Sequence, residues 1–172
     1  MTNRVVITVP GKPVAKARPR TVRLKNGGVR TYTPKNTVDF ERHGNQCAIL
    51  AMRGTKPLTG PIICVIYVEL PIPESWSKKK KQMAIDGTVR PITRPDLDNY
   101  VKGLLDCCNE IVFKDYSQGV DMVVSKDYSH TPQATLYFAE LPNHETPTTQ
   151  SPPVGAIQDR NSFAKAYLHD WL

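Results

Sequence analysis

The sequence lacks the features that would assign a chain to a membrane or to an oxidising compartment. No apolar run reaches the roughly 18 residues that a membrane-spanning helix needs, and the first residues, MTNRVVITVPGK, contain no apolar signal-peptide core. The cysteines include no CxxC pair, which argues against a zinc site or a disulfide framework; they are Cys47, Cys64, Cys107 and Cys108. We therefore expect a cytoplasmic protein with reduced thiols and no membrane partner.

Acidic residues are absent from the first 38 positions, which hold nine lysines and arginines. The whole chain of 172 residues carries a net charge of +7, so the remaining 134 residues sum to −2. A basic segment joined to a slightly acidic body favours a polyanionic partner, most often nucleic acid, over a merely solvated loop. The chain length corresponds to about one ordinary domain with a single core.

The first half of the chain predicts two strands, a loop and a long helix. Residues 4–9 are β-branched and residues 62–70 are apolar, each run is followed by proline, and both predict strands. The basic residues 12–32 contain several prolines and glycines and predict a long mobile loop. Thr33 followed by Pro34 resembles a helix start. We expect that helix to reach about Met52, with Gly54 as its stop, and to pack through Val38, Cys47, Ile49 and Leu50.

The second half predicts two helices and two closing strands. A lysine-rich helix over 77–85 follows a serine cap, and apolar residues spaced three and four apart over 97–112 form a helical stripe. Strands over 120–124 and 135–139, paired with each other, close the fold. These elements predict an α/β (α+β) fold with one small mixed β-sheet packed by two or three helices.

Composition changes near the C-terminus and predicts a domain boundary. Residues 1–140 are assigned to the folded domain. Residues 141–172 are rich in proline and threonine at first and end in NSFAKAYLHDWL, which predicts a linker and a short C-terminal amphipathic segment.

Three acids and a lysine around the 97–112 helix suit phosphodiester hydrolysis. Asp96 and Asp98 lie at or before its first turn, Lys102 one turn later, and Asp115 after the helix. Mg²⁺ prefers oxygen ligands, typically one or two carboxylates with water and substrate phosphate, and a lysine can stabilise charge on the phosphate or the leaving oxygen. The same residues also suit helix capping and an i,i+4 ion pair. Considered by itself, the pattern favours these structural roles.

A set of ordered motifs changes this interpretation. RPDLDN at 94–99, Lys102 and DYSQ at 115–118 resemble the RusA-type Holliday junction resolvases of bacteria and their phages. The pattern of that family is close to [K/R]-P-D-[I/L]-D-N, a lysine-bearing helix and D-D-[S/A]-Q. Further matches, in the same order, are GKP at 11–13, KARPR at 16–20, YTP at 32–34 and SWSKKK at 75–80. The resemblance covers roughly residues 4–140, and several linked motifs are more specific than any one.

The resemblance implies a homodimeric, mixed α/β endonuclease that requires Mg²⁺ or Mn²⁺ and no organic cofactor. Such an enzyme nicks two strands of branched double-stranded DNA, a four-way junction, symmetrically in recombination and repair. Asp96, Asp98 and Asp115 would be metal-binding catalytic carboxylates, and Lys102 the catalytic lysine. The implied DNA contacts are basic residues of the N-terminal segment and of the lysine-rich helix: Lys12, Lys16, Arg18, Arg20, Arg23, Arg30, Lys78 and Lys79.

Tyr116 departs from the family pattern, because this position usually holds the second Asp of the pair, the one implicated in catalysis. A tyrosine keeps its proton at neutral pH and is a poor Mg²⁺ ligand. In an extended segment Asp115 and Tyr116 point to opposite sides, so Asp115 needs a local shift to replace the missing carboxylate, and Asp121 is another substitute. One alternative is therefore a catalytically weakened junction-DNA-binding protein. Another is a protein-interaction module whose basic N-terminal segment contacts an acidic protein.

Overall fold

A four-stranded mixed sheet forms the body of the protein in the computed structural model, which describes residues 3–141. Across the sheet the strands are β1 (Arg4–Pro10), β6 (Gln133–Glu140), β4 (Ile62–Pro71) and β5 (Gly119–Ser129). β6 runs antiparallel to β1 and β4, whereas β4 and β5 are parallel. The predicted α+β class and all four strands are confirmed. The predicted C-terminal linker and amphipathic segment lie outside the described residues.

The predicted pairing of the two closing strands is wrong. β5 pairs with β4, and β6 lies on the other side of β4, between β4 and β1. Only three residues connect β5 to β6, so this connection passes over the end of β4, which terminates at Pro71. Proline lacks the backbone N–H that would continue a ladder, and β4 ends where the connection crosses.

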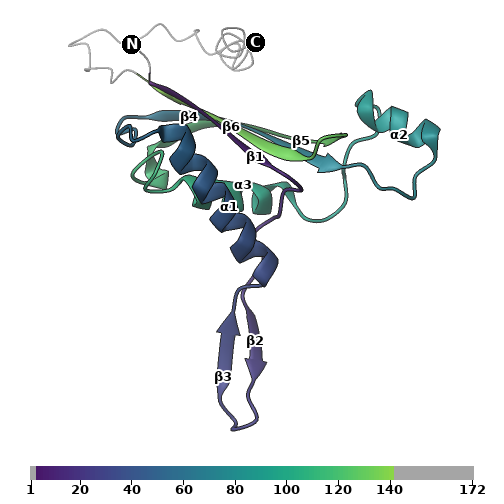
Figure 1. Ribbon diagram of the computed structural model, residues 1–172, viewed down its shortest axis with the longest axis horizontal. Helices are drawn as coiled ribbons and strands as arrows, with labels where there is room; N and C mark the ends of the chain where they lie inside the picture. Colours follow the sequence, from purple (N-terminus) through teal and green to yellow (C-terminus); the bar gives the residue numbers. More distant parts are fainter. Residues whose placement is uncertain (1–2, 142–172) are drawn as a thin grey trace, which may run out of the picture. The chain divides into compact units, whose positions relative to one another are not determined.

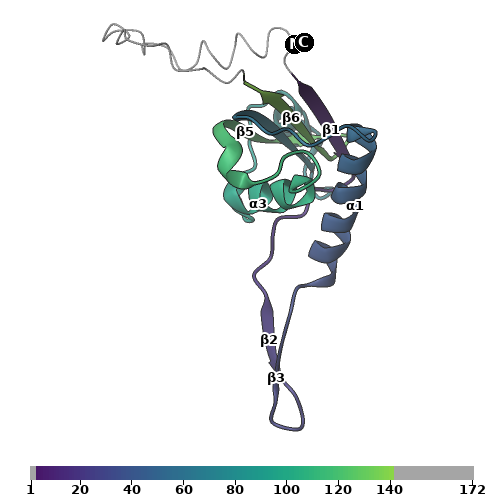
Figure 2. The ribbon, with the colours of Figure 1, turned by 90° about the vertical axis from the view of Figure 1, so that its left-hand side faces the viewer.

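Two helices, α1 (Lys35–Met52) and α3 (Leu97–Cys108), cover one face of the sheet (Figure 2). Side chains alternate between the faces of a strand, and in β4 the residues Ile62, Cys64, Ile66 and Val68 belong to the core under these helices. Leu104 of α3 is fully buried in the same core. The apolar face of α3 therefore anchors the helix, and its polar face stays outward.

The predicted packing face of α1 is wrong except at Cys47, which is partly buried against the core. Ile49 and Leu50 are 53% and 73% exposed, and the helix packs instead through Thr37, Phe40, Gly44, Ala48 and Met52. The reason is close approach to α3, because a Cβ on Gly44 would lie 2.5 Å from the sulfur of Cys107. Small residues thus form the contact, and a count of large apolar side chains misses it. α1 begins one residue later than predicted, with Pro34 at the N-cap.

A β-hairpin occupies much of the segment that the sequence predicts as a loop. β2 (Arg20–Arg23) pairs antiparallel with β3 (Val29–Tyr32), and every residue of both strands is exposed. The hairpin extends away from the body beyond the start of α1 (Figure 1). Gly27, with φ +79°, supplies the left-handed turn conformation that a side chain disfavours. We refer to residues 20–32 as the basic arm.

Helix α2 ends shortly before a glycine turn, and helix α3 ends before its predicted apolar stripe does. α2 (Lys78–Ile85) begins at a Ser77 cap and is followed by Gly87 at φ +74°. α3 stops at Cys108, so the last two apolar residues of its predicted stripe, Ile111 and Val112, lie in the following turn. None of the helices within residues 3–141 combines the length and apolarity needed to cross a membrane.

Candidate active site and nucleic-acid interface

Asp96 and Asp98 lie together at the N-terminus of α3, and both are exposed. Asp96 occupies the N-cap position with extended backbone, but its side chain accepts no capping hydrogen bond. Asp98 lies in the first turn and accepts a 3.2 Å hydrogen bond from the side-chain amide of Asn99. The capping explanation for Asp96 therefore fails, and its carboxylate is available to a ligand.

Lys102 faces the same side of α3, one turn after Asp98. Its Nζ is 3.7 Å from the carboxylate of Asp98, and the two side chains are 66% and 63% exposed. An exposed i,i+4 pair of this kind contributes only about 0.3–0.5 kcal/mol. The ammonium is therefore free to exchange Asp98 for a phosphate.

Lys126 of β5 fixes the segment that leads into this site. Its Nζ donates to the carbonyl oxygens of Thr93 at 3.3 Å and of Pro95 at 3.1 Å. Residue order contains no signal for this role, because Lys126 lies some thirty residues after the segment and meets it only in the folded chain. Lys126 thus positions the backbone directly before Asp96.

Asp115 serves as a cap. Its carboxylate accepts a 2.8 Å hydrogen bond from the backbone N–H of Ser117 and begins a short 3-10 helix, η1 (Tyr116–Gln118). Hydrogen bonds from Ser117 lower the pKa of Asp115 below its usual value. Gln118 completes the capping box and donates to the carbonyl oxygens of Leu58 and Gly60, each at 3.0 Å. The side chains of Asp115 and Gln118 are therefore both engaged in hydrogen bonds that hold η1 in place.

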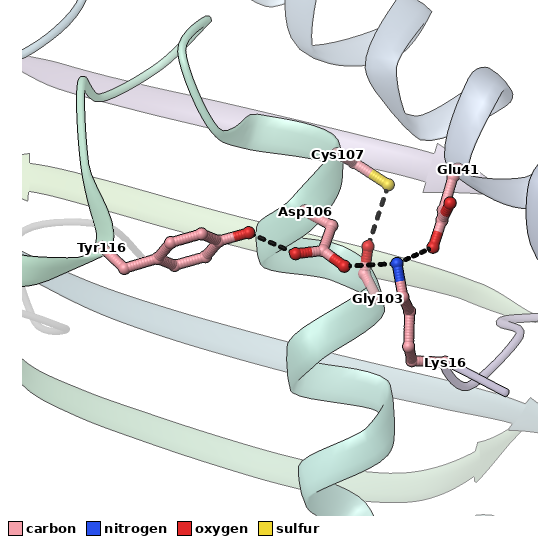
Figure 3. A network of polar contacts seen from close by, with 6 residues as sticks. All are labelled: Lys16, Glu41, Gly103, Asp106, Cys107 and Tyr116. Atoms are coloured by element: carbon pink, nitrogen blue, oxygen red, sulfur yellow. Dashed lines mark hydrogen bonds and ion pairs between the residues drawn. The ribbon is translucent and has the colours of Figure 1, made fainter. Parts of the chain in front are cut away.

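Tyr116 belongs to a polar network on the outer side of α3 (Figure 3). Its hydroxyl donates to Asp106, and its ring packs edge-on against Phe113 with centroids 5.8 Å apart. Burial and the hydrogen bond to Asp106 raise the pKa of Tyr116 above its usual value of 10.0. The phenol therefore stays protonated and acts as a donor to Asp106.

Lys16 completes this network from the N-terminal segment. Its Nζ lies 2.5 Å from Glu41 of α1 and 2.6 Å from Asp106 of α3 (Figure 3). Burial alone would lower the pKa of Lys16, but the hydrogen bonds and charges of Asp106 and Glu41 raise it above 10.5. The positive charge of Lys16 is thus paired with two carboxylates of the protein itself, which disfavours the DNA contact predicted for this lysine.

The structure separates the predicted carboxylates along α3. Tyr116, next to Asp115, contacts Asp106, which follows Asp98 by eight residues, about 12 Å of helix. Asp121 pairs with Ile63 across the sheet, so its side chain leaves the face opposite to the helices. Within residues 3–141, no group of three or more histidine, cysteine, aspartate or glutamate side chains is arranged to hold a metal ion. Only Asp96 and Asp98 are brought together.

The remaining predicted DNA contacts lie on exposed surfaces. Among the described residues no ion pair to an acid is recorded for any of them, and all are exposed: Lys12, Arg18, Arg20, Arg23, Arg30, Lys78 and Lys79. On α2 the ammonium of Lys80 lies 3.9 Å from the ring centre of Trp76, which packs against Tyr128 with centroids 5.1 Å apart. The basic arm and the start of α2 both carry exposed positive side chains.

Comparison with known proteins identifies the family of this chain. A family model described as Endodeoxyribonuclease RusA matches residues 10–137, which include both carboxylates, Lys102 and the basic arm. The chain is 40% identical over 141 residues to the uncharacterized protein YqaN of Bacillus subtilis (strain 168), covering 80% of this chain and 96% of that protein. The chain belongs to the RusA endodeoxyribonuclease family.

Proposed function

We propose that this protein is a metal-dependent endonuclease that resolves four-way DNA junctions by paired symmetric nicks, in recombination and repair. The observation that carries the proposal is the pair Asp96 and Asp98, two exposed carboxylates beside Lys102 at the N-terminus of α3. Membership of the RusA family gives it independent support. The basic arm and α2 would hold the phosphate backbone of the DNA.

The donor set at α3 fits a hard divalent cation. Mg²⁺ binds through one or two carboxylates and keeps several waters and substrate oxygens, and Asp96 has no other recorded partner for its carboxylate. We propose that Asp96 and Asp98 hold Mg²⁺ or Mn²⁺. The bound ion would activate a water and stabilise charge on the phosphate. Asp115 stays outside this pair, because its carboxylate caps η1.

The other groups at the N-terminus of α3 act on the phosphate itself. Backbone N–H groups at a helix start, together with the helix dipole, favour an anion there. Lys102, one turn further on, places a positive charge beside the same point and would stabilise the negative charge that develops on the leaving oxygen. Lys126 would keep the backbone before Asp96 in position through its hydrogen bonds to Thr93 and Pro95.

A homodimer would supply two identical sites related by a two-fold axis. Two such sites suit a substrate with two equivalent strands, because each site cuts one of them. The dimer thus accounts for paired nicks at symmetric positions.

The test is cleavage of a four-way junction labelled on each strand in turn, with Mg²⁺, Mn²⁺ or a chelator. We expect paired nicks in opposite strands with either metal, and their loss in Asp96→Asn and Asp98→Asn. Asp39→Asn is the matched control, because Asp39 is an exposed carboxylate of α1 outside the site. Absence of paired nicks from the wild-type protein, or nicks that survive Asp98→Asn, would contradict the proposal.

A second candidate function is junction binding with weakened or no cleavage. The observation in its favour is Tyr116, which stands where the family usually has an Asp and is bound to Asp106. This candidate predicts salt-sensitive junction binding without nicks under any divalent metal. Recovery of nicking in Tyr116→Asp would support it, and paired nicks by the wild-type protein would exclude it.

A further inference from the structure

Ile92 is the most exposed large apolar side chain among residues 3–141, at 95%. It lies in the loop between α2 and α3, four residues before Asp96. Single exposed apolar residues are common on protein surfaces. The position of Ile92 is notable because of how its loop is held and what lies next to it.

Contacts on both sides hold the loop around Ile92. Pro91 is buried, and the carbonyl oxygen of Thr93 accepts the hydrogen bond from Lys126. Arg90 forms an ion pair with Asp127 at 3.5 Å. Two consecutive residues of β5 therefore contact the chain before and after Ile92, and these contacts hold the backbone of the loop against the sheet.

An exposed positive charge near Ile92 suits a nucleic-acid partner. Arg94 is exposed, and no ion pair is recorded for it among the described residues. An extended chain spans at most about 3.5 Å per residue, so the backbone of Ile92 lies within about 14 Å of that of Asp96. Successive bases of one strand are about 3.4 Å apart. A phosphate bound at Asp96 therefore places Ile92 within about four nucleotides of the cleaved bond.

We propose that Ile92 is an apolar wedge that enters between two bases within about four nucleotides of the cleaved phosphate. The inference rests on the proposed function, since it takes DNA as the partner. Isoleucine is among the side chains that proteins insert between base steps to kink DNA. Insertion between bases costs least where stacking is already weakened, as it is between neighbouring arms at the branch point of a junction. The wedge therefore favours branched over linear DNA.

The experiment replaces Ile92 and measures base unstacking directly. Junctions carry the fluorescent base 2-aminopurine at successive positions around the crossover, and Asp98→Asn is the background, so that no strand is cut. We expect a rise in fluorescence at one or two positions on binding, lost in Ile92→Ser and kept in Ile92→Phe. Ile92→Ser in the otherwise wild-type chain should also lower junction cleavage about tenfold, the effect of removing roughly one buried side chain.

Leu50→Ser is the matched control, because Leu50 is also an exposed apolar side chain, at 73%, and lies on α1. We expect this substitution to leave both the fluorescence change and the cleavage rate unchanged. Sedimentation of Ile92→Ser should show the oligomeric state of the wild-type protein. Unstacking and cleavage within twofold of wild type in Ile92→Ser would overturn the wedge, and so would a change of oligomeric state, which would make Ile92 a protein contact. Binding without cleavage by the wild-type chain would contradict the proposed nuclease and still leave the unstacking measurement decisive for the wedge.

Discussion

Replacing Lys16 by methionine should destabilise the protein more than removing any exposed lysine. Lys16 is the shared cation of Glu41 and Asp106, at 2.5 and 2.6 Å, and its side chain is 36% exposed. Methionine keeps much of the aliphatic stem and removes only the charge. The substitution therefore leaves two carboxylates facing each other without their cation.

The expected loss follows from the geometry. Oxygens that lie 2.5 and 2.6 Å from one Nζ are at most about 5 Å apart. Two negative charges at that distance repel by about 3 kcal/mol at an effective dielectric constant of about 20. Water reaches these side chains, so screening and relaxation reduce the effect. We expect the free energy of unfolding to fall by about 2 kcal/mol.

Urea unfolding followed by circular dichroism measures this loss, with Lys102→Met as the control. The Lys102–Asp98 pair is longer and about two-thirds exposed, so its loss should cost less than about 0.5 kcal/mol. Because the folded-state pKa of Lys16 is raised, its contribution is fully present below about pH 10.5 and disappears as the pH rises further. Equal losses in the two variants, or a wild-type advantage that does not fall as the pH rises above about 10.5, would refute the reasoning.

Three further predictions concern packing, the network and DNA contact. Gly44→Ala places a methyl group against the sulfur of Cys107 and should cost about 1–3 kcal/mol in thermal unfolding; no change would mean that α1 and α3 separate freely. Tyr116→Phe keeps the ring but removes the hydrogen bond to Asp106, and a loss of about 1 kcal/mol in urea unfolding is expected; an unchanged midpoint would contradict it. Arg30→Ala should reduce the salt dependence of junction binding by about one phosphate contact, and an unchanged slope in mobility-shift assays would remove the basic arm from the interface.

The sequence predicted the elements whose pattern is long and strongly periodic. The stripe of α3 and the apolar run of β4 both appear where expected, because burial of one helical face or of a central strand leaves a direct record in residue order. The basic arm is different. The sequence predicts a loop there, since two short strands with exposed side chains on both faces leave no apolar alternation to detect.

The candidate site likewise has a part that the sequence predicts and a part that it does not. Asp96, Asp98 and Lys102 lie within seven consecutive residues, so helical geometry alone predicts that they lie close together. Asp115 is separated from them by the length of α3, and its predicted place beside them depended on a return of the chain that the structure does not make. Its role as a third metal ligand stays a prediction without support from this arrangement.

The sequence by itself determined the family, the segregation of positive charge and the pair of carboxylates at the start of α3, because each depends on residues that are neighbours along the chain. The tertiary structure decided the rest: the position of β6 between β1 and β4, the small-residue contact of α1, and the partners of Lys16, Tyr116 and Lys126. These features depend on contacts between segments far apart in sequence. Only the packed chain shows which charged side chains pair with one another and which stay exposed.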